Sequence, residues 1–515
     1  MKKRPLNVFV SLVSAGTMTA VSTLSAFPQI VYAEGSEFKV TDDYFKYEVN
    51  EDDTIIILGR TKGEYEEDKL VIPSKIEGKP VTIIGKDAFR GTDYSELVLP
   101  DTVVEIEESA FQNTDLISVE IPDSVKKIGY KAFTECDDIT SVTLTPFIEE
   151  IKGSAFSYSD SLEYVYIPNM PALETDDDYA AWFHDSGLKK VELADGITKL
   201  PAQLFSTCDE LTELIWSDDL EIIGKSTFSG CGFTEMIIPE SVKEISEYAF
   251  SNCIFTELTL PEGLKIIGRS AFSECDNLIS FEIPPEVEEI GSRAFGYMDS
   301  LEELYIPNIP AVQNNKFYDS LYLSGLKKIE FADDITVIPE RMCSGCEQLE
   351  EIIWSDSLEE IRDYAFSDCI SLKDPKLPEG LKKIYSYAFT GCTGIINVDL
   401  PLSIEDLGYR PFNDTTSLKY LYVPKQFPST SGEYAGGSAF MNSGIKKLVF
   451  ADGITEINDT FSELPELTEV VIPDSVTKLG DYAFANCANL TAARVPKSVT
   501  SFGKNSFNNC RGCFR

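Results

Sequence analysis

Histidine is almost absent from this sequence, since its 515 residues contain one, His184. Metal sites built from several histidines are therefore excluded. The sequence also lacks a phosphate-binding loop, a nucleophile elbow, a dinucleotide fingerprint and a calcium-binding loop. With 86 acidic residues, carboxylate pairs are too common to indicate a glycosidase site. We therefore expect no catalytic residue, no metal site and no cofactor.

Positive charge is scarce, because 44 Lys and Arg stand against 86 Asp and Glu, which gives a formal net charge of -42. Such a chain is a poor partner for nucleic acid or an anionic membrane. One interpretation of the acidity is solubility and self-repulsion in a protein with much exposed surface. The other is selective attraction of basic patches on a partner. The composition leaves both open.

Long apolar runs are missing outside the N-terminus, so no membrane span is expected in the mature chain. Residues 1–33 combine a basic start, a largely apolar middle from Leu6 to Ala26 and a small-residue exit at Val31–Ala33. This pattern is typical of a secretory signal peptide, with cleavage expected before Glu34. Cleavage removes three basic residues and takes the net charge from -42 to -45. We expect a secreted or cell-surface protein.

A repeated unit fills the rest of the chain, and its cleanest copy is LTLPEGLKIIGRSAFSEC from Leu258 to Cys275. Its Ala-Phe pair returns every 22 or 23 residues, which indicates a solenoid. Each unit holds an alternating apolar run closed by proline, then a second apolar pair, then a glycine before Ala-Phe. The phenylalanines that define this step are Phe89, Phe111, Phe133, Phe156, Phe228, Phe250, Phe272 and Phe295.

The unit L-x-x-V-x-I-P-x-x-V-x-x-I-G-x-x-A-F-x-x-C resembles the leucine-rich repeat of the BspA-like (Treponema-type) family of bacterial cell-surface proteins. The resemblance covers nearly the whole mature chain. It implies a parallel-sheet horseshoe that is exported and often associated with adhesion to host proteins or other bacteria. The family's binding residues share no motif, so none is transferred. We expect a mainly β solenoid of about nineteen coils, roughly 90 Å long at strand spacing.

The predicted organisation is a signal peptide at 1–33, an N-terminal cap at 34–69 and a repeat array at 70–515. Two strands, 45–49 and 54–58, are expected in the cap, which would cover the open edge of the first coil. The array reads as a triplicated block, because variant coils near 165–190, 304–328 and 421–447 each end in a near-identical strand. These strands are SGLKKVELADGIT, SGLKKIEFADDIT and SGIKKLVFADGIT.

Each variant coil replaces the usual second apolar pair with an insert. Counting back from the glycine after each insert predicts that Phe183, Leu321 and Phe440 take the place of the repeated phenylalanine. In the first insert, Asp176 to Asp178 could cap a helix from Tyr179 to Asp185.

Twelve cysteines in an exported chain suggest disulfides, but their placement argues for free thiols. Ten of them follow the phenylalanine position by three residues, where other coils place Thr, Ser or Met. In-register stacking makes their Cβ vectors parallel, which disfavours bridges between coils. Cys343 and Cys513 are the irregular ones. The ten are Cys136, Cys208, Cys231, Cys253, Cys275, Cys346, Cys369, Cys392, Cys487 and Cys510.

Tyrosine occupies the outward strand positions of the variant coils, where most coils carry Glu, Ser, Thr, Lys or Ile. Tyrosine offers a large amphipathic surface and is enriched in binding sites. The alternative is that these rings pack over neighbouring coils or under the inserts. His184 is expected to be a surface helix residue rather than a ligand contact, and Trp216 and Trp354 fall at inward positions. The candidate binding residues are Tyr164, Tyr166, Tyr305, Tyr420 and Tyr422, with the insert aromatics Tyr179, Trp182, Tyr318, Tyr322 and Tyr434.

The function that this sequence favours is a non-enzymatic exported scaffold that binds a macromolecule. The family resemblance implies an adhesin for host or bacterial proteins. A glycan- or mucin-binding module is the competing class, with insert aromatics stacking on sugar rings. A third possibility is a passive stalk or targeting arm for a further domain.

Overall fold

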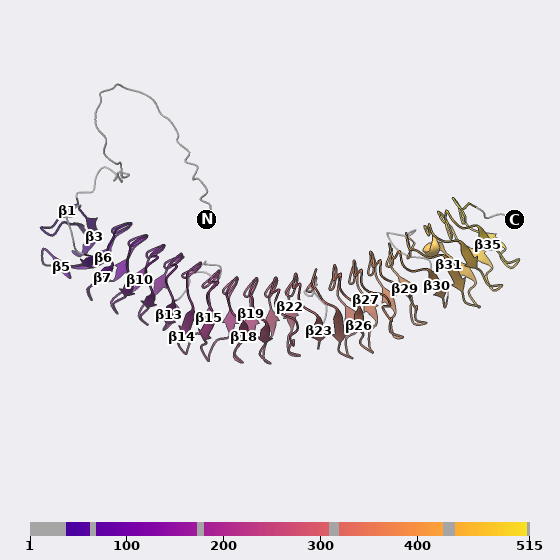
Figure 1. The fold of residues 1–515 in the computed structure, drawn as a ribbon, viewed down its shortest axis with the longest axis horizontal. Coiled ribbons are helices and arrows are strands. Elements are labelled where there is room, and N and C mark those ends of the chain that lie inside the picture. The colour runs from indigo at the N-terminus through magenta and orange to yellow at the C-terminus, as the bar shows by residue number, and fades with distance from the viewer. Residues whose placement is uncertain (1–37, 62–67, 172–179, 308–318, 426–437, 512–515) are drawn as a thin grey trace, which may run out of the picture.

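The computed structural model describes residues 38–61, 68–171, 180–307, 319–425 and 438–511. They form a parallel β-solenoid bent into an arc, with β1 (Lys39–Val40) near one end and β35 (Ala492–Arg494) near the other (Figure 1). The predicted solenoid is confirmed. The signal-peptide prediction and Cys513 lie outside the described residues.

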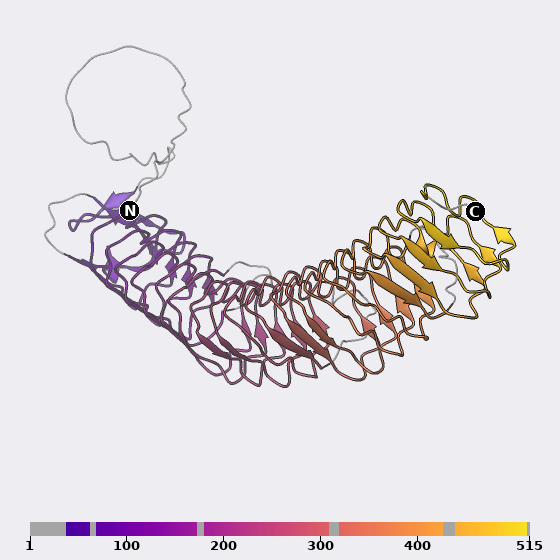
Figure 2. The same ribbon diagram turned by 45° about the vertical axis from the view of Figure 1, so that its right-hand side comes forward.

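One row of strands comes from the alternating run that precedes the proline of each coil. Its strands pair in parallel and in register, with one side chain inward between outward neighbours, as in Ser141↔Tyr164 and Val142↔Val165. Figure 2 shows them side by side along one long side of the arc. They are β4 (Lys69–Val71), β7 (Glu96–Val98), β9 (Ser118–Glu120), β11 (Ser141–Thr143), β13 (Tyr164–Ile167), β14 (Lys190–Leu193), β16 (Glu213–Ile215), β18 (Glu235–Ile237), β20 (Glu257–Thr259), β23 (Glu303–Ile306), β24 (Lys328–Phe331), β26 (Glu351–Ile353), β30 (Tyr420–Val423), β31 (Lys447–Phe450), β33 (Glu469–Val471) and β35.

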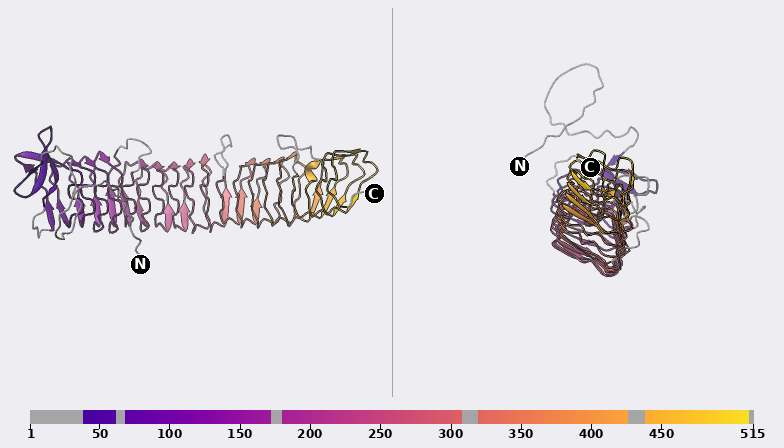
Figure 3. Two further views of the ribbon diagram at one scale, coloured as in Figure 1. Left: turned by 90° about the horizontal axis from the view of Figure 1, so that it is seen from above. Right: turned by 90° about the vertical axis from the view of Figure 1, so that its right-hand side faces the viewer.

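A second row of mostly two-residue strands comes from the second apolar pair of each coil. Seen from above, the two rows follow opposite long edges of the molecule (Figure 3). The second row consists of β6 (Lys79–Ile84), β8 (Glu105–Ile106), β10 (Lys127–Ile128), β12 (Glu150–Ile151), β15 (Lys199–Leu200), β17 (Ile222–Ile223), β19 (Glu244–Ile245), β21 (Ile266–Ile267), β22 (Glu289–Ile290), β25 (Val337–Ile338), β27 (Glu360–Ile361), β28 (Lys383–Ile384), β29 (Asp406–Leu407), β32 (Glu456–Ile457), β34 (Lys478–Leu479) and β36 (Ser501–Phe502).

The repeated Ala-Phe pair lies in a turn that carries a third line of backbone hydrogen bonds between coils. The amide of Phe250 donates to the carbonyl of Ala271, and that of Phe272 to Ala294, over 2.8 and 2.9 Å. The rings stack, with centroids 5.5 Å apart between Phe250 and Phe272. We call this column of buried side chains the spine. Its members are residues 89, 111, 133, 156, 183, 205, 228, 250, 272, 295, 321, 343, 366, 389, 412, 440, 461, 484 and 507.

Two residues of each regular turn have left-handed backbone, one before the Ala-Phe pair and one after it. In the coil of Phe272 these are Ser270 and Glu274, with φ of 50° and 62°. Equivalent positions after the pair hold Asn252 and Gly230, residue types that tolerate this conformation. These two columns of left-handed residues were not predicted from the sequence.

The N-terminal end carries an antiparallel unit, in which β1 pairs with β2 (Phe45–Val49) and β2 with β3 (Ile55–Arg60). β3 then continues in parallel with β6, so the hairpin joins the second row directly. The two strands expected in this region are therefore present. β5 (Lys75–Ile76) pairs antiparallel with β6 in the first coil.

The variant coils keep the spine as predicted. Phe183 stacks between Phe156 and Phe205, at 5.5 and 5.9 Å, and Phe440 stacks 5.1 Å from Phe412. Leu321, 1% exposed, takes the same position in the second block.

The predicted helix from Tyr179 to Asp185 is wrong over its described part. Residues 180–185 form a turn, because this segment must hydrogen-bond to the next coil, as Phe183 does to Leu204. The one helical segment in the described residues is the 3₁₀ turn η1 (Asp459–Phe461). No described helix has the length and apolar character needed to cross a bilayer.

All eleven cysteines within the described residues are free thiols, which agrees with the prediction from their spacing. Cys343 differs from the ten, as predicted, because it occupies the spine itself, where its amide donates to the carbonyl of Ala365.

Candidate functional site

The outward side chains of the first strand row form a continuous surface, here called the strand face. Tyr164 and Tyr166 of β13 are half-buried, while Tyr305 of β23 and Tyr420 and Tyr422 of β30 are each 46% exposed. The alternating residues between them are buried, so the predicted outward orientation of these five tyrosines is confirmed. Their role in binding stays a prediction.

The strand register fixes how far apart these tyrosines lie along the solenoid. Six coil steps separate β13 from β23, and five separate β23 from β30. At strand spacing these intervals correspond to about 29 and 24 Å.

The three tyrosine positions have different neighbours, so they are not copies of one site. Tyr164 donates a hydrogen bond of 3.1 Å to Glu192, and burial and this carboxylate raise the pKa of its phenol. Tyr305 lies between Glu282 and Glu330. Tyr422 lies beside Val449. The neighbours are thus one paired carboxylate, two carboxylates and an aliphatic side chain, respectively.

The two insert aromatics within the described residues, Trp182 and Tyr322, do not join the strand face. Trp182 is fully buried in the alanine position of its coil, and its Nε1 donates 3.1 Å to the carbonyl of Ile151, so its prediction as a binding residue is wrong. Tyr322 packs edge-on to Tyr297, with the guanidinium of Arg293 5.1 Å from its ring centroid. It therefore lies in the turn region. Tyr179, Tyr318 and Tyr434 lie outside the described residues.

The single histidine is engaged within the turns. The Nδ1 atom of His184 lies 2.8 Å from the hydroxyl of Ser206, and its ring packs edge-on against Tyr158. It is partly buried in a turn and does not lie on a helix as expected. Trp216 and Trp354 pack against the core at the predicted inward positions but remain partly exposed.

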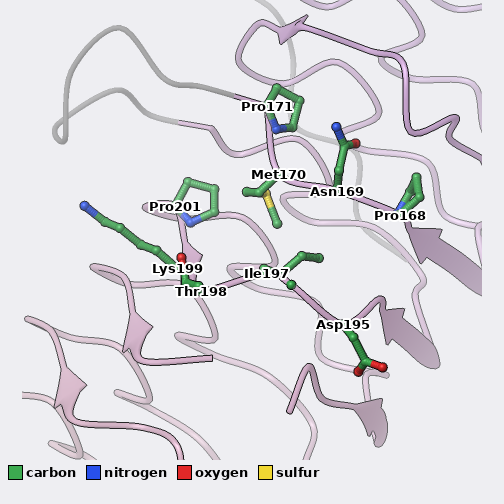
Figure 4. A pocket seen from close by; sticks show the side chains of 10 residues that line it. Pro168, Asn169, Met170, Pro171, Asp195, Ile197, Thr198, Lys199 and Pro201 are labelled. Carbon is green, nitrogen blue, oxygen red and sulfur yellow. The ribbon is translucent and has the colours of Figure 1, made fainter. Parts of the chain in front are cut away.

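A pocket of about 380 Å³ opens where β13 and β14 end (Figure 4). Pro168, Met170 and Pro171 form one side, and Ile197 and Pro201 of the following coil form the other. Asp195 and Lys199 stand at opposite ends of the pocket in Figure 4. The pocket lies at the start of the first insert, which contributes Pro168 to Pro171 to its lining.

Exposed isoleucines also lie on the strand face, as the sequence predicted for the outward positions, but none of them was chosen as a candidate binding residue. Ile237 is 70% exposed and Ile215 is 46% exposed, both at the outward position that carries tyrosine in the variant coils. The alternation that located the tyrosines would also have located these two residues.

The architecture defines the chain as a leucine-rich repeat solenoid. The family model described as the BspA-type leucine-rich repeat region, with six copies, matches residues 82–212, 198–324, 317–435 and 433–513. The chain therefore belongs to the BspA-type leucine-rich repeat family.

Several solved structures are similar to this chain. A leucine-rich repeat protein from Bacteroides ovatus is 27% identical with a TM-score of 0.57, over 75% of this chain and 94% of that one. A leucine-rich repeat protein from Eubacterium ventriosum is 17% identical with a TM-score of 0.37, over 77% and 97%. A leucine-rich cell surface protein from Faecalibacterium prausnitzii is 20% identical with a TM-score of 0.30, over 93% and 100%. No curated protein matched the chain.

Proposed function

We propose that this chain is an exported, non-enzymatic scaffold that binds an extracellular protein through its strand face, as a bacterial surface adhesin. The carrying observation is that three coils replace the usual small or charged outward residues by half-exposed tyrosines. The N-terminal pattern and the family support export. A rigid parallel array presents these rings at fixed intervals, which suits a long or multivalent partner.

The test replaces the three most exposed rings, Tyr305, Tyr420 and Tyr422, by serine. The half-buried Tyr164 and Tyr166 are replaced in a second variant, because Tyr164 also hydrogen-bonds Glu192. Tyr130, Tyr158 and Tyr482, which are 44%, 40% and 41% exposed in the turns, give a matched control triple.

Binding is measured against immobilised matrix proteins, mucin and bacterial cells, and folding is checked by circular dichroism. We expect the strand-face triple to remain folded and to lose at least about tenfold in affinity, while the control triple changes little. Equal losses in both triples, or none in either, would place the binding site elsewhere. Retained protein binding with selective loss on mucin would favour the glycan-binding alternative.

A further inference from the structure

The second tyrosine position lies in a hollow of the strand face. The hollow has a volume of about 230 Å³. The buried side chains of Phe281 and Leu304, 8% and 3% exposed, lie at its base. The ring of Tyr305 forms part of its wall. Lys328, Ser280 and three glutamates complete the lining.

Carboxylates surround this ring because of the strand register. A bridge aligns Tyr305 with Glu282 of the preceding coil, and the β23–β24 pairing aligns it with Glu330 of the next. Glu303, two residues before Tyr305 on β23, faces the same side. Neighbouring strands are about 4.8 Å apart, so the three carboxylates lie within side-chain reach of the ring.

Glu303 is the register neighbour of Lys328 on β24, but no ion pair within 4 Å joins any of the three carboxylates to another residue that the structure describes. Elsewhere the same face pairs its charges across strands, with 3.5 Å between Lys190 and Glu213 and 2.9 Å between Lys447 and Glu469. Negative charge also continues toward β18 and β20, where Glu235 and Glu257 are direct register neighbours. Like charges placed opposite each other destabilise a sheet, so the Glu235–Glu257 pair has no benefit for the fold itself.

An aromatic ring beside unpaired carboxylates is complementary to a cation on an apolar stem. The ring face attracts the cation, the carboxylates accept its charge-assisted hydrogen bonds, and the apolar base contacts the methylene groups. Lysine and arginine side chains have this chemistry. We infer that the face of β23 and β24 docks a basic polypeptide that places a lysine or arginine side chain in the hollow beside Tyr305.

This inference rests on the proposed function and names its partner class at the second tyrosine position. The first position differs because Glu192 is already hydrogen-bonded to Tyr164. The third differs because Val449 stands beside Tyr422, where Glu330 stands beside Tyr305. A partner that spans the arc would therefore meet an acidic site at its centre.

The test uses a short oligo-arginine peptide as the probe, with binding measured at about 0.15 M ionic strength to screen distant charge. The strand-face variant is E282Q/E303Q/E330Q. A matched variant, E262Q/E379Q/E466Q, removes the same charge from exposed loop positions that also lack ion pairs. Two further variants, Tyr305→Phe and Tyr305→Leu, distinguish the effect of the aromatic ring from the effect of side-chain volume.

We expect E282Q/E303Q/E330Q, the hollow triple, to weaken binding of the oligo-arginine peptide by about tenfold or more. The matched variant E262Q/E379Q/E466Q, the loop triple, should weaken it by less than about twofold. Tyr305→Phe should retain binding, and Tyr305→Leu should lose it, because only the aromatic ring attracts the cation. Equal losses in both triples would show attraction by net charge alone and overturn the inference, as would no loss in either. Such a result leaves the proposed function standing, since that is judged by attachment of the serine triple to matrix proteins.

Discussion

The cysteine position is explained by a hydrogen bond to the spine. Thiols donate to the spine carbonyl of the preceding coil, as Cys253 does to Phe228 and Cys275 to Phe250, over 3.1 and 3.2 Å. In coils with threonine or serine the hydroxyl donates to the spine carbonyl of its own coil, as Thr114 does to Phe111 over 3.0 Å. The sequence showed that the position accepts Cys, Thr or Ser. The acceptor of the thiol could not be predicted, because it belongs to the preceding coil.

Burial makes the thiol of Cys253 a strong determinant of alkaline stability. Desolvation raises its pKa to about 12. Because an unfolded cysteine ionises near 8.5, this thiol stabilises the fold below that pH and loses its contribution as the pH rises toward 12. The unfolding free energy should therefore fall by about 1.4 kcal/mol per pH unit for this residue within that window.

Cys253→Ser is the matched variant, since serine keeps a donor at a position where Ser186 occurs naturally. We expect the wild type to lose thermal stability relative to this variant as the pH increases from 9 to 11, measured by melting temperature. A constant difference across this range would contradict the raised pKa.

Titration of the denatured, unreduced protein should also count most of the twelve cysteines as free.

The structural positions of residues in the first insert could be predicted only where the spacing of the repeat fixed them. Phe183 was located by counting back from Gly187, whose backbone approaches Asp160 so closely that a Cβ would lie 1.9 Å from its carbonyl oxygen. Trp182 was misassigned because the same count places it in the alanine position, where a large side chain is not expected. The burial of this ring and its bond to Ile151 are tertiary effects.

At the scale of the coil, the turn is held by backbone hydrogen bonds that require left-handed residues. The helix predicted from Tyr179 to Asp185 does not form over its described part, because the three lines of backbone hydrogen bonds between coils outweigh the local capping signals. The strands could be predicted because burial of every second side chain sets an alternation of apolar and polar residues in the sequence. The turn conformation was not, because Ser, Tyr, Lys, Arg and Glu occupy it alongside Gly and Asn.

Glu274 tests the cost of this turn conformation. Its φ is 62° and its side chain is exposed, so glycine should relieve strain without removing a packed group. We expect Glu274→Gly to raise the unfolding free energy by about 0.5–1 kcal/mol relative to Glu274→Gln, which removes the same charge but keeps the Cβ. Chemical denaturation of the two variants gives the comparison. If the glutamine variant is as stable or more stable, the turn is not strained at this residue.

For the whole molecule, the sequence predicted the solenoid, the triplicated block and the outward tyrosines, because each depends on a period that recurs many times. It did not predict that the three tyrosine positions differ. Their neighbours come from adjacent coils, such as Glu330 beside Tyr305 and Val449 beside Tyr422. These pairs follow from strand register, and the variable insert lengths obscure that register in the sequence.

We expect the spine to make unfolding of the array cooperative along its length. Substitution of Phe272, near the centre of the spine, tests this expectation. Its buried ring lies 5.5 Å from Phe250 and 5.8 Å from Phe295. Phe272→Ala should cost about 3–5 kcal/mol because a cavity opens between two stacked rings.

Phe272→Leu is the control, because Leu321 already occupies the spine in the second block, and it should cost less than about 1.5 kcal/mol. Since each coil is stabilised by its neighbours, the alanine variant should also speed hydrogen exchange at the amides of Phe250 and Phe295 on either side. Thermal unfolding and hydrogen exchange measure the two effects. A large loss of stability with unchanged exchange at both flanking coils would mean that the coils fold independently, and no loss at all would contradict the spine.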